Sequence, residues 1–127
     1  MRASVACALA ELARCYQPGV EDGWLLAPAD MPQLTAAAIR GLLAALDAGR
    51  HEILVPVWQG RRGHPVYFPW LLADAVARLP AGEGIDALVR RGPARQVPAA
   101  DATVLADLDT PEAYEAFLRW LGGVNSA

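Results

Sequence analysis

The chain has 127 residues, of which 54% are hydrophobic and 20% are charged, and its formal net charge is −3. These values predict one domain over residues 1–127 with a true core, and they exclude a disordered chain. The acidic balance argues against nucleic-acid binding, and no apolar run is long enough to cross a membrane, so neither is an expected partner. Because the N-terminus has no signal-peptide pattern, we expect a cytoplasmic protein.

The first predicted element is an amphipathic helix over residues 5–16 that a Pro-Gly pair ends. Its two cysteines, Cys7 and Cys15, are interpreted as small core thiols rather than as a disulfide or a metal pair. A short apolar run at residues 23–27, bounded by turn residues, then predicts a buried strand.

Thr35 is a good N-cap for the second helix, and Gly49 stands just past its expected end. Residues 53–58 are apolar and rich in β-branched side chains, which predicts a second strand. A third short strand is predicted at residues 65–68, after a polar turn. This spacing is typical of a hairpin and is the one place where we expect antiparallel pairing.

Pro69 suits the first position of a third helix. A short helix within residues 82–91 and a weak strand at residues 96–97 follow. Residues 103–108 bring the chain back toward the sheet. The last helix begins after a Thr-Pro-Glu sequence, a cap followed by a first-turn proline and acid, and Gly122 is its predicted end.

Strands and helices alternate along the whole chain. This alternation favours an α/β fold with a mostly parallel sheet in a three-layer α/β/α sandwich. In such sheets, ligands bind outside the carboxyl ends of the strands, so polar residues at those ends are the candidate functional residues.

The first candidate is Asp30, which directly follows the first predicted strand and precedes an irregular Met-Pro turn. A carboxylate at a strand end can hold Mg²⁺ against a phosphate, because Mg²⁺ prefers oxygen ligands and keeps few protein contacts. An Asp that only caps a helix or stabilises a turn is the alternative. The pattern around Asp30 alone leaves both interpretations open.

The second candidate is the polar turn before the third strand, which contains Arg61, Arg62, Gly63, His64 and Pro65. Glycine lets the backbone approach a ligand closely, and the two arginines offer forked donors suited to phosphate oxygens. His64 could donate to a phosphate or orient a substrate. The alternative is an ordinary hairpin turn with solubilising arginines.

The third candidate is a pair of acids, Asp107 and Asp109, which alternation places on the same side of an extended segment. Two carboxylates this close repel each other unless a cation lies between them. Alternatively, Asp109 or Thr110 caps the last helix and Asp107 is solvated. If one crevice collects all three candidates, Mg²⁺ between carboxylates and an anion under the Arg-His loop would suit phosphoryl or nucleotidyl transfer.

The motifs Ala-Asp-Met-Pro, Gly-His-Pro and Asp-Leu-Asp-Thr-Pro-Glu occur in this order. In that order and spacing they resemble the MobA-like NTP transferase family, and within it the molybdenum cofactor cytidylyltransferases. The resemblance implies a Rossmann-like fold of the nucleotide-diphospho-sugar transferase type. It also implies Mg²⁺-dependent transfer of a nucleotidyl group from CTP or GTP to a phosphorylated pterin such as molybdopterin, with release of pyrophosphate.

The resemblance implies roles for single residues as well. Asp30 would hold the metal ion, with Asp107 or Asp109 completing its coordination, and Asp30 and His64 are the expected catalytic residues. The residues expected on the substrate side are Arg61, Arg62, Gly63, His64 and Pro65.

The chain also departs from the family pattern. Family members begin with a strand and a Gly-rich phosphate loop, and this chain resembles only the later part of the family domain. A Gly-Asp-x-Gly-Ala-Arg stretch of the family appears at residues 82–87 without its arginine. Loss of the first strand leaves sheet backbone groups unpaired, so we expect self-association or a partner that completes the sheet. A non-catalytic relic that binds a ligand or a partner is therefore the alternative function.

Overall fold

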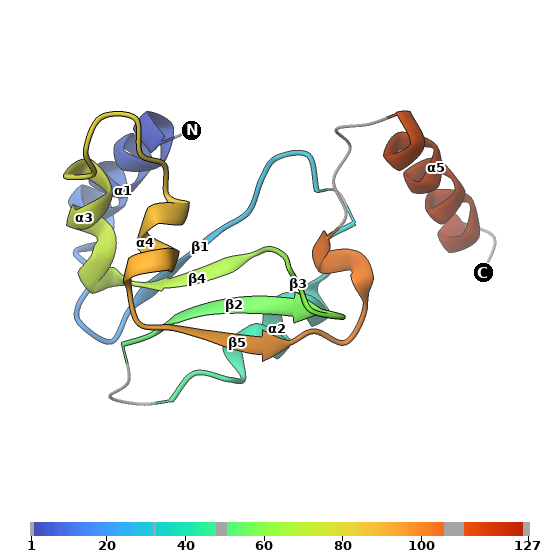
Figure 1. Cartoon of the computed structure of the whole chain (residues 1–127), viewed down its shortest axis with the longest axis horizontal. Helices are drawn as coiled ribbons and strands as arrows, with labels where there is room; N and C mark the ends of the chain where they lie inside the picture. The colour runs from blue at the N-terminus through green and yellow to red at the C-terminus, as the bar shows by residue number, and fades with distance from the viewer. Residues whose placement is uncertain (1, 32, 48–50, 106–110, 126–127) are drawn as a thin grey trace.

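The structure is a computed structural model that describes residues 2–31, 33–47, 51–105 and 111–125. Its helices and strands are, in chain order, α1 (Arg2–Tyr16), β1 (Gly23–Leu26), α2 (Ala36–Leu43), β2 (Ile53–Trp58), β3 (Arg61–Arg62), β4 (Val66–Pro69), η1 (Trp70–Leu72), α3 (Ala73–Ala77), α4 (Asp86–Arg91), β5 (Ala94–Pro98), η2 (Ala102–Leu105) and α5 (Pro111–Asn125). Figure 1 shows α1, α3 and α4 gathered at one end of the sheet. Within these ranges, no helix has the length and apolar character needed to cross a membrane.

The five strands in the described part of the chain form one mixed sheet in the order β1-β4-β2-β3, with β5 paired to β2. β4 is antiparallel to both β1 and β2, β3 is antiparallel to β2, and β5 is parallel to β2. The expected α/β class is therefore right, but the expected mostly parallel sheet is wrong. The reason is that β4 follows β2 without a crossover helix and lies between β1 and β2.

β1, β2 and β5 nevertheless run in one direction, because β4 is antiparallel to both of its neighbours and β5 is parallel to β2. α2 connects β1 to β2, and η1, α3 and α4 connect β4 to β5. The segments that follow β1, β2 and β5 therefore leave the sheet at the same edge, where open α/β sheets bind their ligands.

An apolar core covers each face of the sheet, because successive side chains of a strand point to opposite sides. On β2, Ile53 and Val55 pack in one cluster with Leu9 of α1. Leu54 packs on the other face with Leu42 of α2. Helices thus contact both faces of the sheet.

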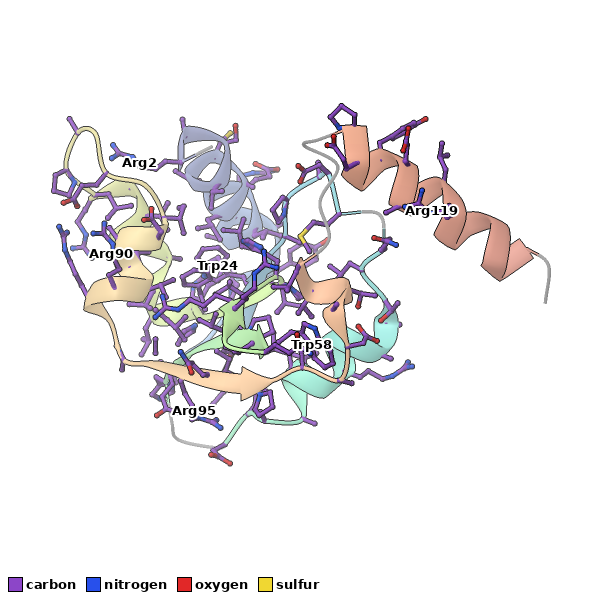
Figure 2. All side chains as sticks on the ribbon, turned by 45° about the vertical axis from the view of Figure 1, so that its right-hand side comes forward. Arg2, Trp24, Trp58, Arg90, Arg95 and Arg119 are labelled. Atoms are coloured by element: carbon purple, nitrogen blue, oxygen red, sulfur yellow. The ribbon has the colours of Figure 1, made fainter. Side chains whose placement is uncertain are left out.

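β1 lies at the edge of the sheet and, among the described strands, pairs with β4 alone. Trp24, labelled in Figure 2, is buried. Its ring stacks on that of Phe68, with ring centroids 4.4 Å apart. Leu25, the next residue, is 38% exposed. The expectation of a buried strand is therefore wrong for half of its side chains, because one face of β1 meets the core and the other does not.

The turn after β2 is tighter than expected. Gln59 and Gly60 connect β2 to β3 with positive φ angles of 49° and 77°. Two successive positive φ angles are typical of the shortest hairpin turns. Part of the predicted turn is thus strand β3, while the predicted antiparallel pairing of β2 with β4 is confirmed at Leu54 and Tyr67.

The first two helices differ from expectation in burial. Cys7 and Cys15 of α1 are exposed, so their interpretation as core thiols is wrong. The predicted cap of α2 is confirmed, since the Thr35 hydroxyl oxygen accepts a hydrogen bond from the backbone N–H of Ala38 at 3.1 Å. α2 ends at Leu43, so the expectation of a helix that continues to Gly49 is wrong; Gly49 itself lies outside the described residues.

The second half of the chain follows the predicted order with shifted boundaries. Pro69 ends β4 instead of starting a helix, while α4 and β5 lie where a short helix and a weak strand were expected. η2 occupies part of the predicted return segment, and the rest of that segment lies outside the described residues. α5 begins at Pro111 as predicted, runs past Gly122, and lies apart from the sheet in Figure 1.

Candidate functional site

A pocket of about 340 Å³ lies at the sheet edge where β1, β2 and β5 end. Residues that follow these strands line it: Pro28, Asp30, Met31, Arg61, Arg62, Gly63, His64, Val104 and Leu105. We call this pocket the candidate site. It brings together residues from the first two motifs that the sequence singles out, because the three strands run in the same direction.

Asp30 enters the candidate site from the turn after β1. Met31 beside it is 93% buried and anchors the turn. The backbone N–H of Leu34 donates a hydrogen bond to the carbonyl oxygen of Met31 at 3.3 Å. Asp30 itself is half-buried, and no described residue forms a hydrogen bond or an ion pair with its carboxylate. A carboxylate that has no partner among the described residues therefore lines the pocket.

Gly63 and His64 are fixed by their backbones. Gly63 N–H donates to the carbonyl oxygen of Pro56 at 2.8 Å, and His64 N–H donates to that of Val104 at 2.8 Å. A Cβ at position 63 would lie far inside van der Waals contact of the Val104 carbonyl. Pro65, next in the chain, is fully buried. Glycine is thus required for a close approach to η2, and the segment holds the His64 side chain at the pocket wall.

Arg61 and Arg62 come from β3 and not from an irregular loop. Both are exposed, and both line the candidate site. The hairpin with β2 gives their backbones a defined position, while their long side chains remain in water. Among the described residues that line the pocket, Arg61 and Arg62 carry two positive charges and Asp30 carries the one carboxylate, so this part of the site is electropositive.

η2 forms a wall of the candidate site that sequence patterns did not identify. Val104 is 98% buried against the Gly63 segment. The turn before it is held by Asp101, whose carboxylate accepts from the backbone N–H of Thr103 at 2.9 Å and from its hydroxyl group. These hydrogen bonds, chiefly that from the hydroxyl, lower the pKa of the Asp101 carboxyl. The Asp-x-Thr pattern is a known local turn signal and could have indicated this wall.

The third predicted motif, Asp107 and Asp109, lies outside the described residues. Leu105, the last described residue before it, lines the candidate site. Among the residues that the structure does describe, no group of three or more His, Cys, Asp or Glu side chains could hold a metal ion.

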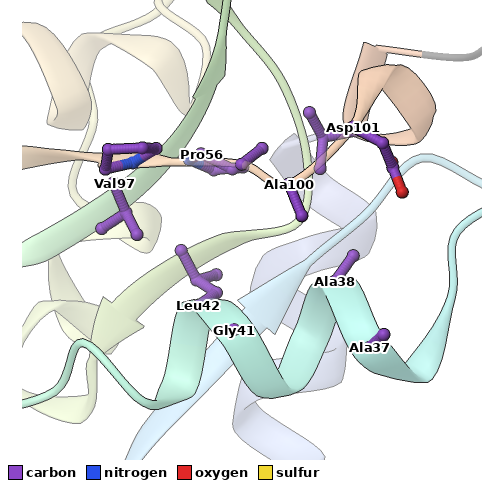
Figure 3. A pocket seen from close by; sticks show the side chains of 11 residues that line it. Ala37, Ala38, Gly41, Leu42, Pro56, Val97, Ala100 and Asp101 are labelled. Carbon is purple, nitrogen blue, oxygen red and sulfur yellow. The ribbon is translucent and has the colours of Figure 1, made fainter.

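A second cavity, of about 140 Å³, lies between α2 and the strands β2 and β5 (Figure 3). Small apolar side chains such as Ala38 and Val97 make most of its wall. Its acid, Asp101, is already bonded to Thr103. The cavity thus lacks the charged groups of the candidate site.

Comparisons with known proteins identify a family for this arrangement. Residues 1–99 match the model described as the MobA-like NTP transferase domain. This match confirms the resemblance inferred from the order of the motifs. Among curated proteins, the comparison finds no match.

Solved structures of similar proteins support the same conclusion. The crystal structure of Rv0371c from Mycobacterium tuberculosis H37Rv is 28% identical with a TM-score of 0.73, over 93% of this chain and 59% of that one. Its homolog from Mycobacterium sp. strain JC1 is also 28% identical with a TM-score of 0.73, over 95% of this chain and 58% of that one. A complex of Rv0371c with manganese is 30% identical with a TM-score of 0.69, over 91% and 60%. The chain thus spans less than two thirds of each relative.

Proposed function

Because the chain belongs to the MobA-like NTP transferase family, we propose that it serves in nucleotidyl transfer. The proposed reaction moves a nucleotidyl group from CTP or GTP to a phosphorylated pterin such as molybdopterin and releases pyrophosphate. The observation that carries this proposal is the candidate site, where Asp30 shares one pocket with Arg61, Arg62 and His64. A carboxylate opposite several cationic or hydrogen-bonding groups suits phosphate chemistry that depends on positioning and charge neutralisation.

The proposed cofactor is Mg²⁺, held by Asp30. The carboxylate of Asp30, which has no partner within the described part of the chain, is the kind of oxygen ligand that such an ion prefers, and a manganese complex of Rv0371c is known. Asp107 or Asp109 is proposed to complete the coordination together with substrate phosphates. Leu105, which precedes Asp107 by two residues in the sequence, lines the pocket and supports this proposal.

The remaining residues of the candidate site act on phosphates. Arg61 and Arg62 bind the phosphate oxygens through their guanidinium donors and offset the charge of the leaving pyrophosphate. His64 donates a hydrogen bond to a phosphate or orients the acceptor, and Gly63 and Pro65 shape the substrate side. In the reaction, an acceptor phosphate oxygen bonds to the α-phosphorus while the bond to pyrophosphate breaks. A bound metal ion supplies charge neutralisation for that step.

The direct test is an assay of pyrophosphate release with CTP or GTP and molybdopterin in the presence of Mg²⁺. We expect release by the unaltered chain and loss of release in Asp30→Asn. Asp74→Asn, which removes an exposed carboxylate on α3, is the matched control and should keep the activity. Release by Asp30→Asn at the unaltered rate would contradict the site assignment.

A non-catalytic role as a ligand-binding module is the second candidate. It is supported by the candidate site, whose cationic and hydrogen-bonding groups can hold a phosphate-bearing ligand without turnover. Calorimetry together with the pyrophosphate-release assay separates the two candidate functions. The second function predicts that the chain binds CTP or GTP with Mg²⁺ but releases no pyrophosphate.

The remaining expectations from the sequence stand as part of this proposal. They are one domain over residues 1–127, a three-layer sandwich, a cytoplasmic location, and no nucleic-acid or membrane partner. The helices on both faces of the sheet support the layered architecture. Among the described strands, β1 has one unpaired side, which supports self-association or a partner that extends the sheet.

A further inference from the structure

A third pocket, of about 280 Å³, lies at the start of β1, at the opposite end of this strand from Asp30. Among the described residues, it shares none of its lining with the candidate site. Three of its lining residues are aromatic: Tyr16 at the end of α1, Trp24 of β1 and Trp70 of η1. We call it the aromatic pocket.

The three aromatic side chains of the aromatic pocket differ in burial. Trp24 is only 8% exposed, and its ring stacks on that of Phe68, with ring centroids 4.4 Å apart. Trp70 is half-buried and packs against the core cluster that contains both of these rings. Tyr16 is 75% exposed. The wall therefore combines two rings that the core holds in place with one ring that is accessible from solvent.

The aromatic pocket also contains a carboxylate, that of Asp22, whose position is fixed by hydrogen bonds. The backbone N–H of Gly19 donates to Oδ2 of Asp22 at 2.8 Å. The backbone N–H of Trp70 donates to the carbonyl oxygen of Asp22 at 2.8 Å, which ties the acid to one of the aromatic residues. Within the described ranges no hydrogen bond or ion pair engages Oδ1, so this oxygen is open to a ligand.

The charge at this end of the sheet is negative. Among the described residues that line the aromatic pocket, Asp22 is the charged one. Burial, followed by the negative charges of Asp22 and Glu21, raises the pKa of the nearby Tyr67 hydroxyl group. Arg14, the basic residue in the last turn of α1, is already paired with Glu11. The pocket therefore favours a cation over an anion such as a phosphate.

The wall of the aromatic pocket contains a polar group that the protein leaves unpaired. The indole Nε1 of Trp24 is buried and has no hydrogen-bond partner among the described residues (Figure 2 labels Trp24). Such donors are uncommon in a folded interior, because an unpaired buried N–H costs free energy. This group marks the pocket as a place that a ligand with an oxygen atom can complete.

We propose that the aromatic pocket binds the alkylated ammonium group of a small organic cation. Aromatic rings attract a cation through the negative faces of their π-systems, and groups of such rings are the usual recognition sites of quaternary ammonium ligands. The carboxylate of Asp22 adds charge attraction, and Leu12 and Pro18 in the lining offer apolar contact to the alkyl groups. The proposal does not depend on nucleotidyl transfer, because the two pockets have separate linings.

The test compares choline with 3,3-dimethylbutan-1-ol, which has nearly the same shape and hydroxyl group but no charge. Titrations followed by NMR report on the indole N–H signals of Trp24 and Trp70, with Trp58 of β2, outside the pocket, as the internal reference. Choline should shift the signals of Trp24 and Trp70 and leave that of Trp58 in place. The neutral alcohol should bind at least about fivefold more weakly, since it lacks the attraction of the rings and of Asp22 for a cation.

Two exposed residues allow the pocket to be altered without a change in the core. Asp22→Asn keeps an oxygen that accepts from Gly19 but removes the charge, and it should weaken choline by about two- to fivefold. Glu21→Gln, one residue away and outside the lining, is the matched control and should stay within about twofold of the unaltered chain. Tyr16→Leu should weaken choline by about two- to fivefold, whereas Tyr16→Phe keeps the ring and should bind as before.

The proposal is overturned if choline leaves the signals of Trp24 and Trp70 in place, or if the neutral alcohol binds as tightly as choline. Unaltered choline affinity in Asp22→Asn or in Tyr16→Leu overturns it as well. Equal weakening by Asp22→Asn and Glu21→Gln would show a general effect of surface charge and would likewise contradict a defined site. Binding of Mn²⁺ with pyrophosphate should be the same in all four variants, so the outcome leaves the proposed function to its own test.

Discussion

The backbone N–H of His64 donates to the carbonyl oxygen of Val104 at 2.8 Å. This bond joins the segment after β3 to η2, forty residues later in the chain, and closes one wall of the candidate site. The contact requires that no side chain stand at the preceding residue, Gly63, whose Cβ would collide with the same carbonyl group.

Gly63→Ala is therefore expected to destabilise the protein by about 1–3 kcal/mol, the usual cost of overpacking a close contact. Gly41→Ala is the matched control, because a Cβ at Gly41 meets nothing within 4 Å. In the middle of α2, that change should stabilise by about 0.5–1 kcal/mol. Urea unfolding measures both, and equal effects of the two substitutions would show that the Gly63 contact is not formed.

The hydrogen bonds of Asp101 predict a pH dependence. They lower the pKa of its carboxyl from the ordinary value of 3.8, so their contribution is present above the unfolded pKa and is lost as the pH falls through the folded one. Thr103→Val removes the hydroxyl donor and should raise the pKa of Asp101 toward its ordinary value. NMR titration of the carboxyl group measures this shift. Thr103→Ser keeps the donor, and a pKa equal in the two variants would argue against the hydroxyl bond.

The open edge of β1 predicts association of the chain with itself. Its outer side is unpaired among the described strands, and Leu25 beside it is 38% exposed. We expect a molar mass that rises with protein concentration in light scattering. Leu25→Lys should shift this rise to higher concentration, because charged side chains oppose edge pairing. A monomer at all concentrations in both forms would rule out this use of the edge.

Arg61 tests the electrostatics of the candidate site. Arg61→Ala should weaken pyrophosphate binding by about tenfold, as expected for one charged hydrogen bond. Binding should also become less sensitive to salt, since salt screens exposed charges. Arg40→Ala removes an exposed cation from α2, away from the site, and should change neither property. Calorimetry at two salt concentrations gives both readings.

Local sequence patterns predicted the helices and strands better than they predicted which strands pair with each other. Strand β2 was predicted with its observed ends, because a short β-branched apolar run between polar residues has few other uses. The alternation of helices and strands also indicated the common direction of β1, β2 and β5. It did not indicate that β4 lies between β1 and β2, because pairing partners are chosen by contacts far apart in the chain.

The same limit applies to the candidate site. The sequence predicted that Asp30 follows one strand and that Arg61, Arg62 and His64 follow the next. These residues share a pocket because the two strands, β1 and β2, run in the same direction. Gly63 was interpreted as a residue that lets the backbone approach a ligand closely, whereas the structure shows a close contact with Val104. That contact joins residues distant in sequence, so no local pattern reveals it.

Manganese binding, followed by electron paramagnetic resonance with pyrophosphate present, tests most directly whether the Asp30 carboxylate and its neighbours form a metal–phosphate site. Asp30→Asn should weaken Mn²⁺ binding by at least about tenfold, since removal even of an outer partner of a metal ligand has that effect. Asp74→Asn should bind as the unaltered chain does. Equal Mn²⁺ affinity in Asp30→Asn and the unaltered chain, with both folded, would contradict the assignment.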